Sequence, residues 1–191
     1  MSASPWRDDP VIAATRRWVD RAVIGLNLCP FAKGVQTKGQ VHYAVSPATD
    51  GQELLDDLKS ELHALHAADP AQRDTTLLIA PQVFADFLDF NDFLDRADRL
   101  LRKMRLGGDY QIASFHPQFL FADADADDMS HYTNRAPYPI LHLLRESSID
   151  RAVEAFPDAA LIFEKNMQTL RALGVEGWLA LDVGPARDNA L

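Results

Sequence analysis

The densest group of chemically reactive residues lies in one segment, residues 116–139. It contains two histidines, His116 and His131, which could move protons, and Arg135, which could hold an anion. Connections of this length without clear secondary structure are uncommon and are usually functional or disordered. The aromatic residues and three prolines of this segment favour packing over disorder. We therefore take it as the first candidate site.

Carboxylates in the same segment could complete a metal site. Imidazole nitrogens and carboxylate oxygens are ligands for iron, manganese or zinc, so the metal hypothesis names His116, His131, Asp123 and Asp125. The acidic run resembles the start of a calcium loop, but Asp128 occupies the position where an EF-hand requires glycine, which excludes that motif. No established zinc spacing occurs. The alternative is a solvated acidic turn with two structural histidines.

Arg135 is followed by two prolines and a tyrosine, in the order Arg135-Ala-Pro-Tyr-Pro139. Restricted backbone angles would hold the guanidinium in place, which suits bidentate capture of a carboxylate or phosphate. Pairing with a nearby aspartate is the alternative.

Two further residues are candidates for catalysis. His142 lies in an apolar run, where a neutral, hydrogen-bonded core histidine is the commoner role, but it would point towards His116 if their strands were neighbours. Cys29 is the only cysteine. A nucleophilic thiolate needs a lowered pKa, whereas a position after the end of a helix would raise it. A structural, buried thiol is therefore the alternative for Cys29.

Hydrophobic periodicity predicts the elements that position these residues. Helices are expected from Pro10 to about Gly25, from Thr49 or Asp50 to Asp69, over 87–104, from Ser147 and from Pro157. Strands are expected over 41–45, 75–80, 110–115 and 140–144, with a last short strand over 178–181; the run over 140–144 could instead begin a helix.

This order of elements predicts an α/β fold: a small, mainly parallel four-stranded sheet packed with helices, to which an N-terminal helix and C-terminal helices are added. Parallel strands present their carboxyl ends at one edge, where α/β sheets bind ligands. That edge would collect Ser46, Gln82 and His116. No linker divides the chain, so we expect one domain over 8–183 and a flexible tail over 184–191.

Composition limits the classes of partner. The 191 residues include 28 Asp and Glu against 19 Lys and Arg, a net charge of −9. An acidic chain repels phosphate backbones, so we expect no nucleic acid. The first residues do not resemble a signal peptide, and no apolar stretch is long enough to cross a bilayer. A single cysteine fits a reducing compartment. These features favour a soluble, cytoplasmic protein without a membrane partner.

Four phenylalanines suggest a second use for the helix over 87–104. Phe84 and Phe93 fall outside the stripe formed by Phe87, Phe90 and Leu94. Exposed rings would mark a protein interface or a homodimer contact, whereas a helix covered on two sides would bury them all.

Four segments together resemble an uncharacterised bacterial family, domain of unknown function fourteen-fifteen. They are Gly25–Ala32 (GLNLCPFA), the phenylalanine-rich helix 84–94, Ser114–Phe119 (SFHPQF) and Asn134–Glu146 (NRAPYPILHLLRE). The similarity runs from about residue 10 to about residue 183 and implies a short, single-domain protein. It brings no activity and no site residues.

Two functions follow from these residues. The first is a small cytoplasmic enzyme that acts on a small anionic metabolite, by acid–base chemistry or with a divalent metal such as iron, manganese or zinc. His116 would be the general base or a metal ligand, His131 and an aspartate its partners, and Arg135 the anion clamp. The alternative is a non-catalytic accessory protein, or a homodimer, that binds a protein partner through the aromatic helix surface.

Overall fold

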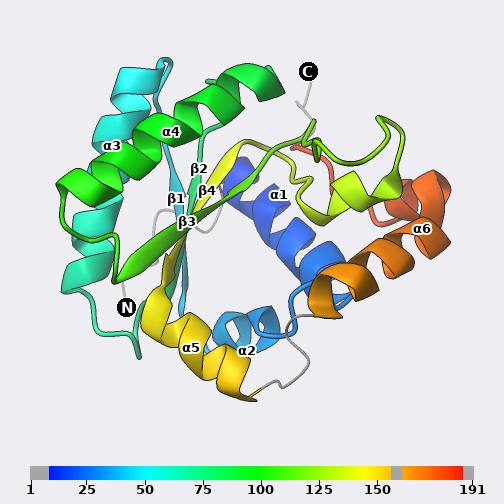
Figure 1. The fold of residues 1–191 in the computed structure, drawn as a ribbon, viewed down its shortest axis with the longest axis horizontal. Helices are drawn as coiled ribbons and strands as arrows, with labels where there is room; N and C mark the ends of the chain where they lie inside the picture. Colours follow the sequence, from blue (N-terminus) through cyan, green and yellow to red (C-terminus); the bar gives the residue numbers. More distant parts are fainter. Residues whose placement is uncertain (1–8, 156–160, 187–191) are drawn as a thin grey trace.

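A four-stranded sheet lies at the centre of the computed structural model, which describes residues 9–155 and 161–186 (Figure 1). Each strand predicted over 41–45, 75–80, 110–115 and 140–144 is confirmed, with bounds that differ by at most one residue. The strands are β1 (Val41–Val45), β2 (Thr75–Ile79), β3 (Tyr110–Phe115) and β4 (Ile140–Arg145), and their order across the sheet is β1-β2-β4-β3.

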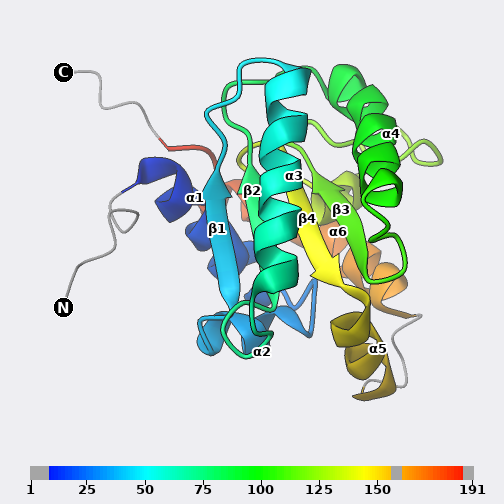
Figure 2. The same cartoon turned by 90° about the vertical axis from the view of Figure 1, so that its left-hand side faces the viewer.

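The sheet is mixed, so the prediction of a mainly parallel sheet is wrong. Only β1 and β2 pair in parallel, while β4 runs antiparallel to both β2 and β3 (Figure 2). β3 still points the same way as β1 and β2, because two antiparallel steps separate it from β2. The carboxyl ends of these three strands therefore meet at one edge as expected. The error arises because the order of elements along the chain does not show where a last strand inserts.

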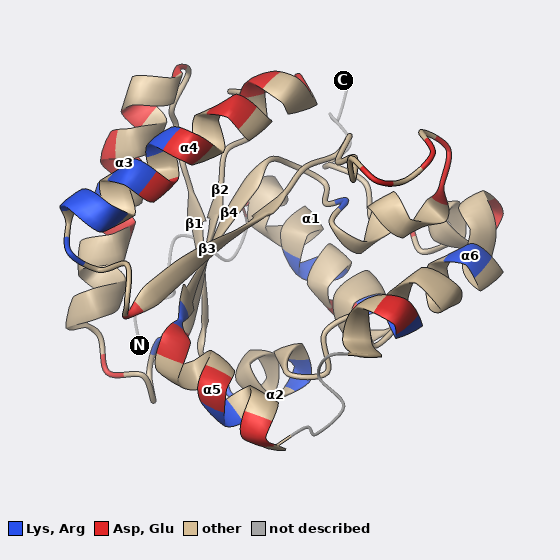
Figure 3. Ribbon diagram, viewed as in Figure 1, with Lys and Arg blue, Asp and Glu red and all other residues tan. Residues whose placement is uncertain are grey.

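Two helices cover one face of the sheet, α3 (Gly51–Ala67) and α4 (Phe87–Lys103) (Figure 1). Each begins after an aspartate, Asp50 or Asp86, whose side chain accepts hydrogen bonds from two backbone N–H groups of the first turn. Their outer surfaces carry interspersed acidic and basic residues (Figure 3). Their inner stripes form the core against the sheet, with Leu54, Leu58, Leu62, Leu65, Phe90 and Ala97 nearly or fully buried.

The opposite face carries the N-terminal helix, which is continuous to Gly25 as predicted. It consists of α1 (Pro10–Trp18), capped by Asp9, and a π-helical stretch, η1 (Val19–Ile24). Its apolar side packs against β1 and β2 (Trp18, Val19 and Ala22 against Tyr43, Leu77 and Ile79). A Cβ at Gly25 would lie 2.2 Å from the carbonyl oxygen of Arg21, so this position requires glycine.

The remaining elements are α2 (Ala32–Thr37), the 3-10 helix η2 (Met129–Thr133), α5 (Glu146–Ala155) and α6 (Ile162–Ala180). The expected C-terminal helices are therefore present, and α5 is the helix predicted from Ser147. The helix predicted from Pro157 begins outside the described residues. The strand predicted over 178–181 is wrong: the chain bends at Gly174, where φ is 67°, and helical structure then continues to Ala180.

The end of the chain that the structure describes contacts the body of the protein. Arg17 Nη2 donates to the carbonyl oxygen of Gly184, and the backbone N–H of Ala186 donates to the hydroxyl of Tyr138. The rest of the tail predicted over 184–191 lies outside the described residues. Within 9–155 and 161–186, no helix has both the length and the apolar character needed to cross a membrane.

Arg145, at the end of β4, connects the sheet to α3. Its guanidinium is buried, and Nη2 donates to the carbonyl oxygens of Leu65, at 2.6 Å, and Ala68, at 2.9 Å. Nη1 donates to the hydroxyl of Tyr110 at 2.9 Å. Carbonyl groups at a helix C-terminus lack intrahelical donors and are stabilised by a cation. Arg145 therefore caps α3 from a distant part of the sequence.

Replacing this guanidinium should destabilise the fold. We expect Arg145→Met to lower the free energy of unfolding by about 3 kcal/mol, because buried carbonyl oxygens lose a charged donor. Denaturant titration measures the change. The control is Arg102→Met, at an exposed position of α4, with an expected change within about 0.5 kcal/mol. Equal effects of the two substitutions would refute the capping role.

Candidate functional site

His116 is fully buried at the end of β3, next to the ring of Phe87 and stacked on Phe90 with ring centroids 5.3 Å apart. Its Nδ1 accepts a hydrogen bond from the backbone N–H of Gln118, and its Nε2 donates to the carbonyl oxygen of Phe84. Burial lowers the pKa of the imidazole. Both ring nitrogens of this neutral histidine are thus occupied by the backbone, and they fix the turn after the strand.

His131 is bound in the same way. It is fully buried in η2, its Nδ1 accepts from the backbone N–H of Phe121, and its Nε2 donates to the carbonyl oxygen of Asp125. Ring contacts lead from His116 to His131 through the side chains of Phe87, Phe119 and Phe121. Both predicted proton-transfer residues therefore belong to a packed aromatic row, and in this conformation neither has a free lone pair.

The acidic residues of the segment do not gather around these histidines as metal ligands. Among residues 9–155 and 161–186, no three His, Cys, Asp or Glu side chains are placed to hold a metal ion. The metal prediction for His116, His131, Asp123 and Asp125 therefore gains no support from the geometry. Asp128 instead caps η2 and pairs with Arg171, whose guanidinium holds the pKa of that carboxyl well below its usual range.

Arg135 lies over an aromatic ring. Its guanidinium carbon is 4.3 Å from the centroid of Tyr132, and its Nε donates to the carbonyl oxygen of Phe119. It forms no ion pair with any aspartate that the structure describes. The predicted anion clamp therefore has no carboxylate partner among the described residues, but the nitrogens of the two histidines expected beside it are bound to the backbone.

The phenylalanines at the start of α4 lie in the core. Phe87, Phe90 and Phe93 are buried, and Phe84 is half-buried with its ring 4.7 Å from that of Phe93. Phe84 has a positive φ of 59°, which turns its side chain back over the helix. The aromatic interface hypothesis therefore loses the exposed rings on which it was based.

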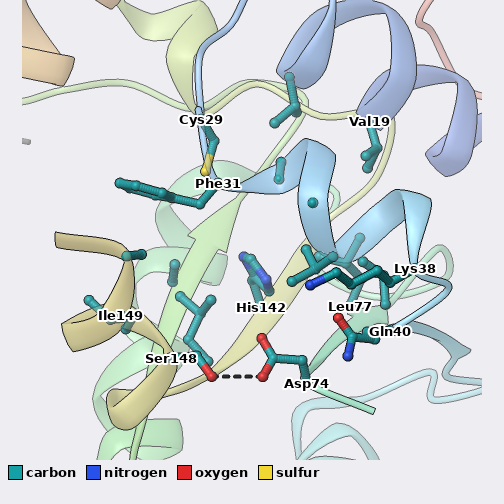
Figure 4. A pocket seen from close by; sticks show the side chains of 18 of the residues that line it. Val19, Cys29, Phe31, Lys38, Gln40, Asp74, Leu77, His142, Ser148 and Ile149 are labelled. Atoms are coloured by element: carbon teal, nitrogen blue, oxygen red, sulfur yellow. Dashed lines mark hydrogen bonds between the residues drawn. The ribbon is translucent and has the colours of Figure 1, made fainter. Parts of the chain in front are cut away.

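A cavity of about 860 Å³ lies on the other face of the sheet, between η1, α2 and α5 (Figure 4). Its floor is formed by strand residues, and α5 forms one wall with Ile149 and Ala152. None of the described residues of α5 is fully buried. The strand residues of the floor are Val41, Leu77, Gln111, Ala113, Phe115, His142 and Leu144.

This cavity lies opposite the edge at which a site was predicted. Gln40 and Asp74 precede β1 and β2, and Gln111 is near the start of β3, so most of the lining is near the amino ends of these strands, and the floor extends along β3 to Phe115. His116 and the 116–139 segment are at their carboxyl ends. The antiparallel β4 accounts for the difference, because it returns the chain to the amino edge, where α5 begins.

His142 lies in the floor of the cavity and makes no contact with His116. Its Nε2 is 2.8 Å from the hydroxyl of Thr75, which itself donates to the carbonyl oxygen of Leu143 at 2.6 Å. Burial lowers the pKa of His142 to about 4, so the ring is neutral near pH 7. The expected hydrogen-bonded histidine is present, but one edge of its ring faces the cavity.

Cys29 reaches the same cavity from the segment before α2, so two of the predicted catalytic residues share one space (Figure 4). Burial raises the pKa of the thiol, and the backbone N–H groups of Phe31 and Ala32, which favour the thiolate, have a smaller effect. No hydrogen bond joins Cys29 to His142 within the described structure. The two residues therefore line the same cavity as a neutral thiol and a neutral imidazole, with no interaction between them in the described structure.

Polar residues of the cavity were missed from the sequence, among them Asp74, Ser148 and Lys38. Ser148 donates to a carboxylate oxygen of Asp74 at 2.7 Å, and Lys38 lies at the end of α2. Nothing in their local sequence distinguishes them from ordinary surface residues. The amphipathic pattern of α5 was visible, but the cavity beneath it depends on which strand α5 follows.

Comparison with known proteins gives one match. A family profile described as "Protein of unknown function (DUF1415)" matches residues 10–180. No curated protein and no solved structure matches the chain significantly.

A structural role for His116 predicts a loss of stability on its removal. We expect His116→Ala to lower the free energy of unfolding by about 3 kcal/mol, since it opens a space beside two phenylalanine rings and leaves two backbone groups unpaired. Denaturant titration measures the effect, with His63→Ala at an exposed position of α3 as control. A change no larger than that of the control would contradict this role.

The lowered pKa of His142 predicts a pH dependence of stability. Its pKa is about 4 in the folded chain against about 6.5 for a histidine in the unfolded chain, so below about pH 6.5 the unfolded chain binds a proton that the folded chain does not. The contribution of the neutral His142 ring to the free energy of unfolding is therefore fully present above about pH 6.5 and is lost as the pH falls towards 4.

Comparison with His142→Phe isolates this contribution, because the other titrating groups remain. Between about pH 7 and pH 4.5, we expect the wild type to lose about 2 kcal/mol more than the variant in denaturant titrations. Parallel losses in the two proteins would show that His142 is protonated in the folded state.

Proposed function

The chain belongs to the family of proteins of unknown function that it matches over residues 10–180, and from the geometry of its cavity we propose that it binds a small molecule with a mainly apolar body. The observation that carries the proposal is the cavity volume of about 860 Å³. Sites for small ligands typically enclose roughly 300–1,000 Å³ and combine apolar walls with a few convergent polar groups.

The lining of the cavity has this character. Apolar side chains from three directions face it, including Val19 and Val23 of η1, Leu77 and Phe115 of the sheet and Ile149 of α5. The cavity is open to solvent on one side, so its apolar walls face water, which is unfavourable in proportion to the apolar area exposed. An apolar ligand would remove the walls from water.

Three of the four segments that resemble the family form part of this lining. Gly25–Ala32 contributes Cys29, Pro30, Phe31 and Ala32, Ser114–Phe119 contributes Phe115, and Asn134–Glu146 contributes His142 and Leu144. This placement supports a role of the cavity in what the family does.

The rim favours a ligand with an anionic group. The side chain of Lys38 extends towards the cavity and forms no ion pair with any described residue (Figure 4). Arg151, also at the rim, lies 3.9 Å from Asp74. An anionic group of the ligand would therefore lie beside Lys38. The hypothesis of a small anionic metabolite, which came from the sequence, is thus kept, but its site is this cavity and not the segment 116–139.

The earlier hypotheses have less support in the geometry. Proton transfer or metal binding by His116 or His131 would require each ring to release a backbone hydrogen bond. The rings expected to form an interface on α4 are buried or half-buried. We therefore base the function on ligand binding in the cavity.

A substitution that fills the cavity should abolish binding. The probe is 1-anilinonaphthalene-8-sulfonate, which combines an aromatic body with one negative charge and fluoresces in apolar surroundings. We expect wild type to bind it and Ala113→Phe to bind it at least about tenfold more weakly, because the new ring would occupy the floor beside His142.

The matched control is Ala64→Phe, which adds the same ring at an exposed position of α3 and should leave the affinity unchanged. Near-ultraviolet circular dichroism and cooperative unfolding confirm that both variants are folded. Equal binding by the two variants would place the probe elsewhere, and absence of binding to wild type would overturn the proposed function.

A further inference from the structure

The polar group in the floor of the cavity places a chemical requirement on the ligand. We propose that His142 acts as a hydrogen-bond acceptor, so that the ligand presents a hydroxyl or amide N–H to its Nδ1, and that Thr75 sets this requirement by fixing the tautomer of the ring. The inference rests on the proposed function, because it names the chemistry of a ligand in the same cavity.

The hydroxyl of Thr75 determines where the imidazole proton is. Its oxygen lies 2.6 Å from the carbonyl oxygen of Leu143, which can only accept a hydrogen bond. The single hydroxyl hydrogen of Thr75 must lie between these two oxygens, because two oxygen atoms this close would repel each other without a hydrogen bond. The same hydroxyl oxygen is then the acceptor for His142 Nε2 at 2.8 Å, so Nε2 carries the proton.

A neutral imidazole that is protonated at Nε2 has its lone pair on Nδ1. No described side chain or backbone group donates to this atom. The charged groups at the cavity, Lys38, Asp74 and Arg151, form no hydrogen bond to the ring, and the low pKa of His142 agrees with a neutral state near pH 7. Nδ1 is therefore an acceptor without a protein partner.

The acceptor is held rigidly. Thr75 and Leu143 lie in the central strands β2 and β4, whose pairing aligns Thr76 with Leu143 and Leu77 with His142. The ring is thus fixed by groups that are part of the sheet. A site built to hydrogen-bond a ligand hydroxyl strongly rejects an analogue that lacks it, because a polar group is then left unpaired.

A matched pair of probes tests the requirement. 1-Naphthol and 1-methoxynaphthalene have the same aromatic body, but only the first can donate a hydrogen bond. We expect wild type to bind 1-naphthol about tenfold more tightly than the ether, and His142→Phe to bind the two with equal affinity. Fluorescence titration measures each affinity.

Variants of Thr75 separate the fixed tautomer from the mere presence of the imidazole. Thr75→Ser keeps the hydroxyl and should retain the preference for 1-naphthol, whereas Thr75→Val removes it and should reduce the preference to less than about threefold. Near-ultraviolet circular dichroism checks that each variant is folded. Loss of the preference in Thr75→Ser, or its full retention in Thr75→Val, would overturn the role of Thr75.

Nitrogen-15 chemical shifts of labelled histidine provide a test without any ligand. At about pH 7 the ring of His142 should show a protonated Nε2 and an unprotonated Nδ1, and the opposite tautomer would overturn the inference.

Failure of the inference is distinguishable from failure of the proposed function. Equal affinity of wild type for the two naphthalene probes, or binding of the anionic probe in the cavity without binding of 1-naphthol, overturns only the requirement for a donor. If no probe binds to wild type, the cavity is not a ligand site and both proposals fall.

Discussion

The insertion of β4 between β2 and β3 is the constraint on which the rest of the structure depends. An antiparallel strand at this position brings the chain back to the amino edge of the other three strands. It places Arg145 at the C-terminus of α3 and His142 beside Thr75, and it makes α5 begin at the amino edge of the other three strands. The Arg145 cap of α3, the imidazole of His142 in the cavity floor and the α5 wall of the cavity therefore all follow from the pairing of β4 with β2 and β3.

The elements themselves could be predicted because their signals are local. An aspartate before a helix, a periodic spacing of apolar residues or a glycine at a helix end indicates an element from a few neighbouring residues alone. Such signals correctly predicted β1 and the start of α1. The pairing of β4 depends on contacts between residues distant in sequence, which periodicity does not encode. The same limit explains the error over 178–181, where a short apolar run continues α6 after the bend at Gly174.

The candidate site was harder to predict, since the same residue type serves opposite purposes. A histidine in a turn-rich segment can transfer protons or can bind two backbone groups, and only the surroundings decide between them. His116 and His131 have both nitrogens bound to the backbone, whereas His142, which an apolar sequence marked as structural, keeps one ring nitrogen without a partner among the described residues. What distinguishes these three residues is their hydrogen-bond partners, and these come from other segments of the chain.

The two sides of the cavity differ in how firmly they are held, and this difference suits selective binding. The floor belongs to central strands, where Thr75 and Leu143 fix the ring of His142. The opposite wall is α5, none of whose described residues is fully buried. Elements with few buried apolar contacts open at lower free energy than core strands. A rigid floor can therefore select the polar group of a ligand, while a wall that adjusts can enclose apolar bodies of different shape.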